Sequence, residues 1–182
     1  GVATPANGTV TITVGDNTAA ASVKQSENFE IIPKANAGYE IDTVSYRLTT
    51  ADDVADSYTT VTVDDNGKYT VAGAALSGDI TVKVTFKAIN YNITNNTVAE
   101  NGNSIAIRIG DTEAATAIVG QTITIVPTIA NGYKLKSISV KNGNTDVTVT
   151  NNTFTMPAAD VTVEATFEVW DGIYYSQDFE SY

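Results

Sequence analysis

The chain has 182 residues and a formal net charge of −11, from 21 acidic and 10 basic residues, with no Cys and no His. Without a cluster of Lys or Arg, nucleic acid and anionic membrane surfaces are excluded as expected partners, because phosphate groups require a basic face. The absence of Cys excludes disulfides and thiolate chemistry, and the absence of His removes the commonest catalytic base and zinc ligand.

Composition predicts an all-β protein with little or no helix. Thr, Val and Ile together supply 64 residues (28, 20 and 16), whereas Leu occurs three times. Side chains branched at Cβ suit the pleated surface of a sheet, and the scarcity of Leu removes the usual filler of helix faces. No apolar run approaches 18 residues, so membrane insertion is not expected.

The sequence contains an internal repeat. Asn7-Gly8 returns as Asn101-Gly102, and Gly38-Tyr39 returns as Gly132-Tyr133, both 94 positions later. The offset falls to 85 at Tyr69 and Phe154 and to 81 in the last strand, so the first copy carries about nine extra residues after its Gly-Tyr pair and about four more later. We therefore expect modules at 1–88 and 89–168, with 169–182 forming a tail or starting a following module.

Alternation of apolar and polar residues predicts a set of half-buried strands in antiparallel sheets. In the last strand of the second copy, Val161, Val163, Ala165 and Phe167 share one face. The predicted strands are 10–14, 28–33, 39–48, 58–63, 67–72 and 80–86 in the first copy, and 105–109, 121–126, 133–141, 145–150, 152–156 and 161–167 in the second. Each module is predicted to be β-grasp-like or sandwich-like, with a short link at Ala88-Ile89-Asn90.

The longest strand of each copy contains a change of phase. Tyr39 and Ile41 alternate in one phase, but Val44 and the apolar residues after it are one position out. The second copy repeats this slip after Leu135. One additional residue turns all later side chains to the opposite face, so we predict a bulge or bend near Thr43 and Ser137.

Acidic loops in the first copy are candidate calcium sites, because calcium binds clustered oxygen ligands. Asp64, Asp65 and Asn66 precede Gly67, and Asp52, Asp53 and Asp56 lie in the segment 51–57, which is expected to be a helical turn or a mobile loop. Neither cluster has the spacing of an EF-hand, and Asp-Asn-Gly is also typical of a hairpin turn. Turn formation is the favoured interpretation, with calcium binding as the alternative.

Exposed aromatic residues are the candidates for sugar binding, because sugars stack on aromatic rings. Tyr39, Tyr69, Tyr133 and Phe154 recur at equivalent positions, which favours packing between strands. Trp170, Tyr174 and Tyr175 lie outside the repeat and are the better ligand-binding candidates. The alternatives for this tail are packing against the second copy or the start of another domain.

Catalysis is not expected, and no cofactor is predicted. A glycosidase requires two carboxylates that face one cleft. The available carboxylates are predicted to lie at turns or on solvent faces of strands, where they keep the surface soluble. These residues are Glu100, Asp111, Glu113, Glu164 and Glu168.

Two phrases in the second copy carry a family resemblance. The stretch FTMPAADVTVEATF (154–167), together with Gly-Tyr-Lys-Leu at 132–135, resembles divergent internalin-B B-repeat modules. The resemblance covers about 89–168 well. The first copy resembles the family more loosely, because YTVAGAALSGD replaces the Met-Pro-Ala-Ala link. The tail 174–182 is similar to the opening of jelly-roll modules in polysaccharide-degrading proteins.

This resemblance implies a secreted or cell-wall-associated bacterial protein in which the modules are non-catalytic spacers. They would present a neighbouring adhesive or carbohydrate-active domain of the same polypeptide. The alternative is an adhesin-like module that binds a polysaccharide or a host surface protein.

Overall fold

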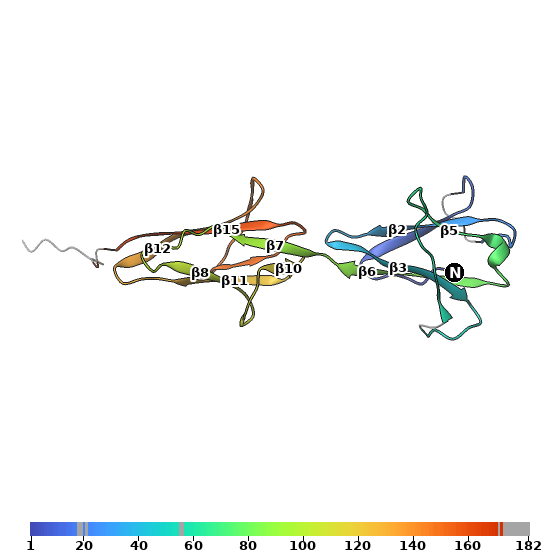
Figure 1. The fold of residues 1–182 in the computed structure, drawn as a ribbon, viewed down its shortest axis with the longest axis horizontal. Helices are drawn as coiled ribbons and strands as arrows, with labels where there is room; N and C mark the ends of the chain where they lie inside the picture. Colours follow the sequence, from blue (N-terminus) through green and yellow to red (C-terminus); the bar gives the residue numbers. More distant parts are fainter. Residues whose placement is uncertain (18–19, 21, 55–56, 171, 173–182) are drawn as a thin grey trace, which may run out of the picture. The chain divides into compact units, whose positions relative to one another are not determined.

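The structure is a computed structural model that describes residues 1–17, 20, 22–54, 57–170 and 172. The chain divides into two compact units between Ile89 and Asn90, which we call the first and the second unit. Each unit consists of strands arranged in two layers (Figure 1). The predicted all-β class is confirmed.

The first unit contains two three-stranded sheets. Its described elements are β1 (Gly8–Thr13), β2 (Phe29–Ala35), β3 (Tyr39–Leu48), β4 (Thr59–Thr60), β5 (Tyr69–Val71), the 3₁₀ turn η2 (Gly73–Ala75) and β6 (Ile80–Ala88). The strand orders are β1-β2-β5 and β4-β3-β6, and all of these pairs are antiparallel.

The second unit repeats this plan and adds strands. Its elements are β7 (Asn90–Asn95), β8 (Ser104–Ile109), β9 (Thr112–Glu113), β10 (Thr116–Ile118), β11 (Thr122–Thr128), β12 (Tyr133–Asn142), β13 (Thr145–Val147), β14 (Thr153–Thr155) and β15 (Val161–Val169). The sheets are β14-β11-β8-β9 and β10-β7-β15-β12-β13. The orders β8-β11-β14 and β13-β12-β15 correspond to β1-β2-β5 and β4-β3-β6 in the first unit.

Each unit buries one apolar core between its two sheets. In the second unit the core joins Ile123 and Ile125 of one sheet to Val161, Val163 and Ala165 of the other. The first unit has the same arrangement, with its own core cluster drawn from both sheets. Two sheets that enclose one core form a sandwich, so the sandwich-like alternative describes the units.

The predicted irregularity in the longest strand is confirmed in both units. The pairing of β3 with β6 shifts register between Ile41 and Thr43, and that of β12 with β15 shifts between Leu135 and Ser137. The extra residue in each unit is a bulge that returns the apolar side chains to the core face. Beside it, two hydroxyls lie 2.7 Å apart across the strands in each unit. These pairs are Thr43 with Thr85 and Ser137 with Thr166.

Three features differ from the sequence predictions. The strands expected at 58–63 and 145–150 are reduced to Thr59–Thr60 and Thr145–Val147. The strands β7, β9 and β10 were not predicted, and β7 pairs with β15 in parallel, so the second unit is not wholly antiparallel. The expected three-residue link is a single residue, because β6 ends at Ala88 and β7 begins at Asn90.

Replacing Ile123 with Ala is expected to lower the free energy of unfolding by about 2–5 kcal/mol, because it leaves a cavity between two packed sheets. Ile123 is fully buried, whereas Ile129 is 45% exposed. The matched variant Ile129→Ala should therefore change the free energy by less than about 0.5 kcal/mol. Urea unfolding followed by circular dichroism measures both, and equal losses would contradict the placement of the core.

Candidate functional site

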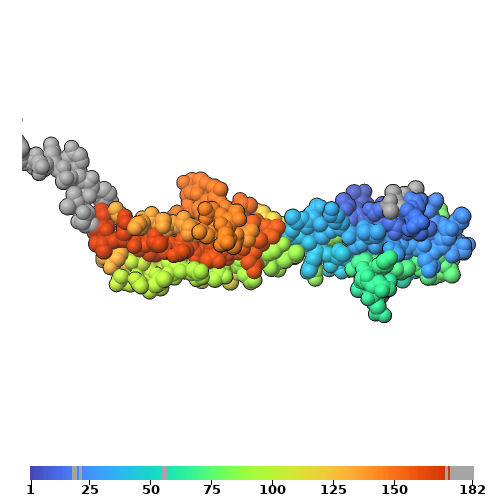
Figure 2. Space-filling model, turned by 90° about the horizontal axis from the view of Figure 1, so that it is seen from above, coloured from blue at the N-terminus to red at the C-terminus, as the bar shows by residue number. Residues whose placement is uncertain are grey.

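The acidic candidates Asp64, Asp65 and Asn66 form the turn that precedes β5. The Oδ1 atom of Asp64 accepts hydrogen bonds from the backbone N–H groups of Asn66 and Lys68, each at 2.9 Å. The bond from Lys68 is the main cause that lowers the pKa of Asp64 below its ordinary value. The whole turn is exposed and projects from the surface of the first unit (Figure 2, green). One oxygen of Asp64 is therefore already engaged in holding the turn.

The same turn is tied to β2 by an ion pair. The Nζ atom of Lys68 donates to Oε1 of Glu30 at 2.6 Å, and this bond raises the pKa of Lys68. Within the described residues, no group of three or more acidic side chains is arranged to hold a metal ion. Asp56, part of the second acidic cluster, lies outside the described residues.

Trp170 occupies a repeat position, contrary to the prediction that it lies outside the repeat. Its backbone N–H donates to the carbonyl oxygen of Gly132 at 2.8 Å, directly after β15. In the first unit, Ile89 donates to Gly38 at 2.9 Å, directly after β6. Trp170 and Ile89 therefore close their units in the same way. The Trp170 residue is half-buried. Tyr174 and Tyr175 lie outside the described residues.

Two of the four recurring aromatic residues pack in the cores of their units. Phe154 is buried in the core of the second unit, and Tyr69 packs against the core of the first. Tyr39 and Tyr133, which begin β3 and β12, are half-buried.

Of the candidate carboxylates, Glu164 and Glu168 lie on β15, Glu113 lies on β9, and Glu100 and Asp111 lie outside the strands. Glu100, Asp111, Glu113 and Glu164 are exposed, whereas Glu168 is half-buried in β15. Glu168 forms ion pairs with two lysines of β12, Lys134 at 3.3 Å and Lys136 at 3.8 Å.

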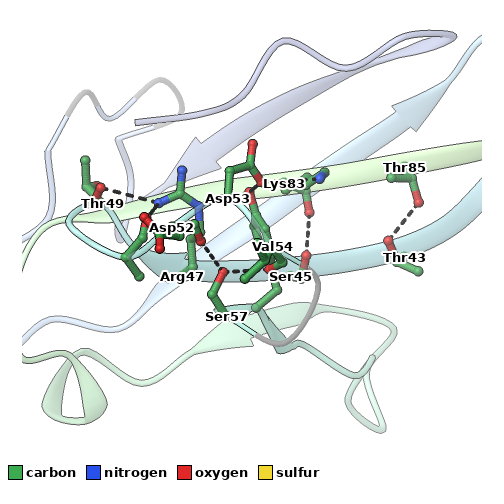
Figure 3. Close-up of polar contacts among 12 residues, drawn as sticks. Thr43, Ser45, Arg47, Thr49, Asp52, Asp53, Val54, Ser57, Lys83 and Thr85 are labelled. Atoms are coloured by element: carbon green, nitrogen blue, oxygen red, sulfur yellow. Dashed lines mark hydrogen bonds and ion pairs between the residues drawn. The ribbon is translucent and has the colours of Figure 1, made fainter.

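Sequence reasoning missed a cluster of charged and aromatic side chains on the sheet β4-β3-β6. This Tyr58 cluster consists of Arg47 on β3, Lys83 on β6, and Asp53 and Tyr58 of the insertion after β3. Figure 3 shows Arg47, Asp53 and Lys83 beside the sheet. The Tyr58 hydroxyl donates to Oδ1 of Asp53 at 2.8 Å and accepts from Nε of Arg47 at 3.1 Å. The two cations also lie over the Tyr58 ring, with Lys83 Nζ at 4.8 Å and Arg47 Cζ at 5.6 Å from its centroid.

The Tyr58 cluster fixes the ends of the insertion to the sheet. Nη1 of Arg47 donates to the carbonyl oxygens of Leu48, Thr49 and Ala51. Lys83 Nζ lies 3.6 Å from Oδ1 of Asp53. The hydrogen bond from Tyr58, followed by the charge of Lys83, lowers the pKa of Asp53. Each charge in the cluster has an opposite charge or a hydrogen-bonding partner, which is typical of a structural contact.

No sequence motif predicts the Tyr58 cluster. Arg47 and Lys83 come from strands that are adjacent in space but far apart in the sequence, and Tyr58 lies near the end of the insertion. The one available signal was that Arg47 and Lys83 occupy polar positions of the predicted strands 39–48 and 80–86 in the copy that carries the insertion.

The fold defines the chain as a tandem of small β-sandwich units. Residues 91–170, which run from β7 to Trp170, match the family model of the divergent InlB B-repeat domain, a non-catalytic repeat domain. The resemblance expected for the second copy is thereby confirmed, and the match does not extend to the first unit. Comparisons with curated proteins and with solved structures gave no match.

Replacing Tyr58 with Phe is expected to raise the pKa of Asp53 toward its ordinary value of 3.8, because the main hydrogen bond to the carboxylate is lost. Since the pKa of Asp53 is lowered in the folded chain, the bond stabilises the insertion above about pH 4 and is lost as the pH falls through the folded value. Carboxyl-carbon NMR titration measures the change. The pKa of Asp64, held by Lys68, should not move in this variant. An unchanged pKa at Asp53 would contradict the contact.

Proposed function

We propose that the chain is a non-catalytic spacer region of a secreted or cell-wall-associated bacterial protein, in which each unit extends the polypeptide toward a neighbouring adhesive or carbohydrate-active domain. We also infer that residues 1–89 are a second, more divergent copy of the same repeat. The shared strand orders and the repeated bulge support this inference.

The observation that carries the spacer role is the parallel pairing of the strands by which the chain enters and leaves the second unit. Ile93 of β7 is level with Val161 of β15, and both strands run in the same direction. The chain begins the unit at Asn90, three residues before Ile93, and ends β15 at Val169, eight residues beyond Val161. At about 3.3 Å per residue, these two points are about 36 Å apart along the strands. The unit thus carries the chain from one end to the other.

The chain runs through the first unit in the same way. Val2 pairs in parallel with Val82, and β6 continues to Ala88. In both units the last strand pairs with two neighbours. On one side it pairs with the long strand that contains the bulge, and on the other with the segment by which the chain enters the unit. A pull on the two ends would therefore load the hydrogen bonds between parallel strands in shear, which suits a part that keeps a neighbour at a distance.

The proposed location rests on the family. The divergent InlB B-repeat family suggests a surface or secreted protein. None of the helical segments in the described part of the chain has the length and apolar character needed to cross a bilayer. The 21 acidic residues are consistent with an extended part that remains soluble.

Spin labels at Asn90→Cys and Val169→Cys are expected to report one long, narrow distance, near 36 Å between backbones plus the label tethers. The natural chain has no Cys, so each label is unique. The matched pair Asn90→Cys and Lys141→Cys should report a backbone distance of about 16 Å, because Lys141 is level with Thr162 on the far side of β15. Pulsed electron spin resonance gives both values. A short or broad distribution for the first pair would contradict the end-to-end path.

The purified chain is expected to show no retardation on plant, microbial or mucin polysaccharides in affinity electrophoresis, and its Trp170 fluorescence should not change. A spacer needs no ligand of its own. Retardation accompanied by a fluorescence shift would overturn the spacer role in favour of the glycan-binding alternative, and Trp170→Ala would then show whether the indole contacts the sugar.

A further inference from the structure

The sequence contains five Asn-Gly pairs, the dipeptide in which an Asn side chain deamidates most readily. They are Asn7-Gly8, Asn66-Gly67, Asn101-Gly102, Asn131-Gly132 and Asn142-Gly143. In this reaction the backbone nitrogen of Gly loses its proton and attacks Cγ of the Asn side chain, and a new C–N bond forms as ammonia leaves. Water then opens the cyclic imide to give aspartate or isoaspartate. Gly favours the attack because it has no side chain to obstruct it.

The fold decides how fast each pair can react. The peptide unit between the two residues must rotate before the ring can close, so hydrogen bonds to this unit slow the reaction. In the first unit both pairs are held in this way. The Asn7 carbonyl oxygen accepts the N–H of Asn36 at 2.9 Å, and the Gly67 N–H donates to the carbonyl oxygen of Asp64 at 2.9 Å.

A third pair is held by the hairpin of β12 and β13. Asn142 is the last residue of β12 and pairs with Thr145 in the antiparallel ladder. The ion pair between Lys141 and Asp146, at 3.9 Å, spans the same hairpin. Rotation of the peptide unit after Asn142 would therefore disturb the end of the ladder.

The remaining two pairs have free peptide units. In the part of the chain that the structure describes, neither the Asn101-Gly102 unit nor the Asn131-Gly132 unit forms a hydrogen bond within the protein. All four residues are exposed. At Gly132 the surrounding space is open, with no atom of another segment within 4 Å of the place where a side chain would begin. These two pairs can therefore reach the geometry of ring closure without loss of a hydrogen bond.

A comparison of the units explains why the Asn101 carbonyl is free. The second unit has one more residue than the first between its Asn-Gly landmark and the centre of the following strand. Ala130 stands at the position of Asn36, but its N–H donates at 2.8 Å to Oδ1 of Asn103, which is 3% exposed. The buried side chain thus takes the hydrogen bond that holds the Asn7 carbonyl in the first unit.

The first unit also lacks the second reactive amide. A turn of the same kind opens β3 and β12, and in each case the N–H of the first tyrosine closes it at 3.1 Å. The residue before the turn glycine is Ala37 in the first unit and Asn131 in the second. The fold therefore accepts Ala at this position.

The two free pairs lie close together in the second unit. The Cβ atom of Ala130, which precedes Asn131, lies 3.6 Å from the place where a side chain of Gly102 would begin. The carbonyl oxygen of Gly132 accepts the N–H of Trp170 at 2.8 Å, directly after β15. Both pairs are thus at the end of the unit that this hydrogen bond closes.

We propose that Asn101 and Asn131 are sites of spontaneous deamidation in the folded chain. Water is the only other reactant, and each event replaces a neutral amide with a carboxylate. Isoaspartate also lengthens the main chain by one methylene group, so at position 131 it displaces the Gly132 carbonyl from the N–H of Trp170. The second unit thereby changes covalently with age at one end, whereas the first unit is protected at the equivalent positions. The proposal does not depend on the spacer role, since it concerns the chemistry of two turns.

The test follows all five pairs in the full chain during prolonged incubation in mildly alkaline buffer. Peptide mapping by mass spectrometry reports the exchange of amide for carboxylate at each Asn, and isoaspartyl methyltransferase labels isoaspartate. Asn101 and Asn131 are expected to react about five- to tenfold faster than the other three, the factor that corresponds to one hydrogen bond. The rates should rise with pH, because the Gly nitrogen must lose its proton.

Two controls separate the effect of the fold from that of the local sequence. In urea the five pairs should react at similar rates. Equal rates in the folded chain would overturn the proposal, as would a folded chain in which Asn101 and Asn131 do not react while the unfolded chain does.

The second control uses the residue that the first unit already carries. Trp170 is the only Trp of the chain, and its fluorescence should drift during incubation as the turn before β12 is modified. Asn131→Ala should abolish this drift and leave the reaction at Asn101 unchanged, whereas Asn66→Ala should leave the drift as it is. A drift that persists in Asn131→Ala would overturn the effect on the Trp170 hydrogen bond.

Discussion

The rest of the structure depends on the long antiparallel pairing of β3 with β6 and of β12 with β15. Each pair supplies the apolar face on which the opposite sheet packs, and each is interrupted by a one-residue bulge. Without the bulge, the residues on either side of it would point to opposite faces of the sheet. Because the unit has fewer than 100 residues and no disulfide, it cannot lose half of this face and still enclose a core. The bulge is therefore a requirement of the fold.

The direction of the chain through each unit follows from which strand pairs with the free edge of the two strands joined at the bulge. The edge of β15 that faces away from β12 is free for one further strand, and β7 occupies it in parallel. A parallel neighbour brings the chain in at the end opposite to the one where β15 leaves. The same choice of edge thus gives the unit its end-to-end path and closes its core with Ile93. In the first unit, Val2 pairs in parallel with Val82 at the corresponding edge of β6.

The two units differ most at the insertion in the first unit. Charged side chains hold this insertion against the sheet. Arg47 and Lys83 hold Tyr58 and Asp53 against the outer face of the sheet, where the apolar core is not involved. In the second unit the residue equivalent to Arg47 is Lys141, which forms an ion pair with Asp146 across a short hairpin. Exposed contacts of this kind contribute little to the stability of a fold. They allow the length of a loop to vary while the core stays the same.

The sequence by itself determined the class of the fold, the repeat, most strand positions and both bulges. These features are local, because a period of two and a slip in that period are visible in a single strand. The landmarks of the repeat are positions where the backbone needs Asn or Gly, since Asn7, Asn101, Gly38 and Gly132 adopt the positive φ values that these residues tolerate best. The sequence also placed residues 89–168 near a known repeat family.

The tertiary structure alone decided which strands become neighbours. The period-two pattern of Tyr91 and Ile93 was present in the sequence, but its parallel pairing with β15 joins residues about 68 positions apart. The Tyr58 cluster likewise combines Arg47 and Lys83 from strands whose adjacency no local pattern encodes. Long-range pairing depends on which strand edges remain free after the core has formed. A local sequence pattern contains no information about those free edges.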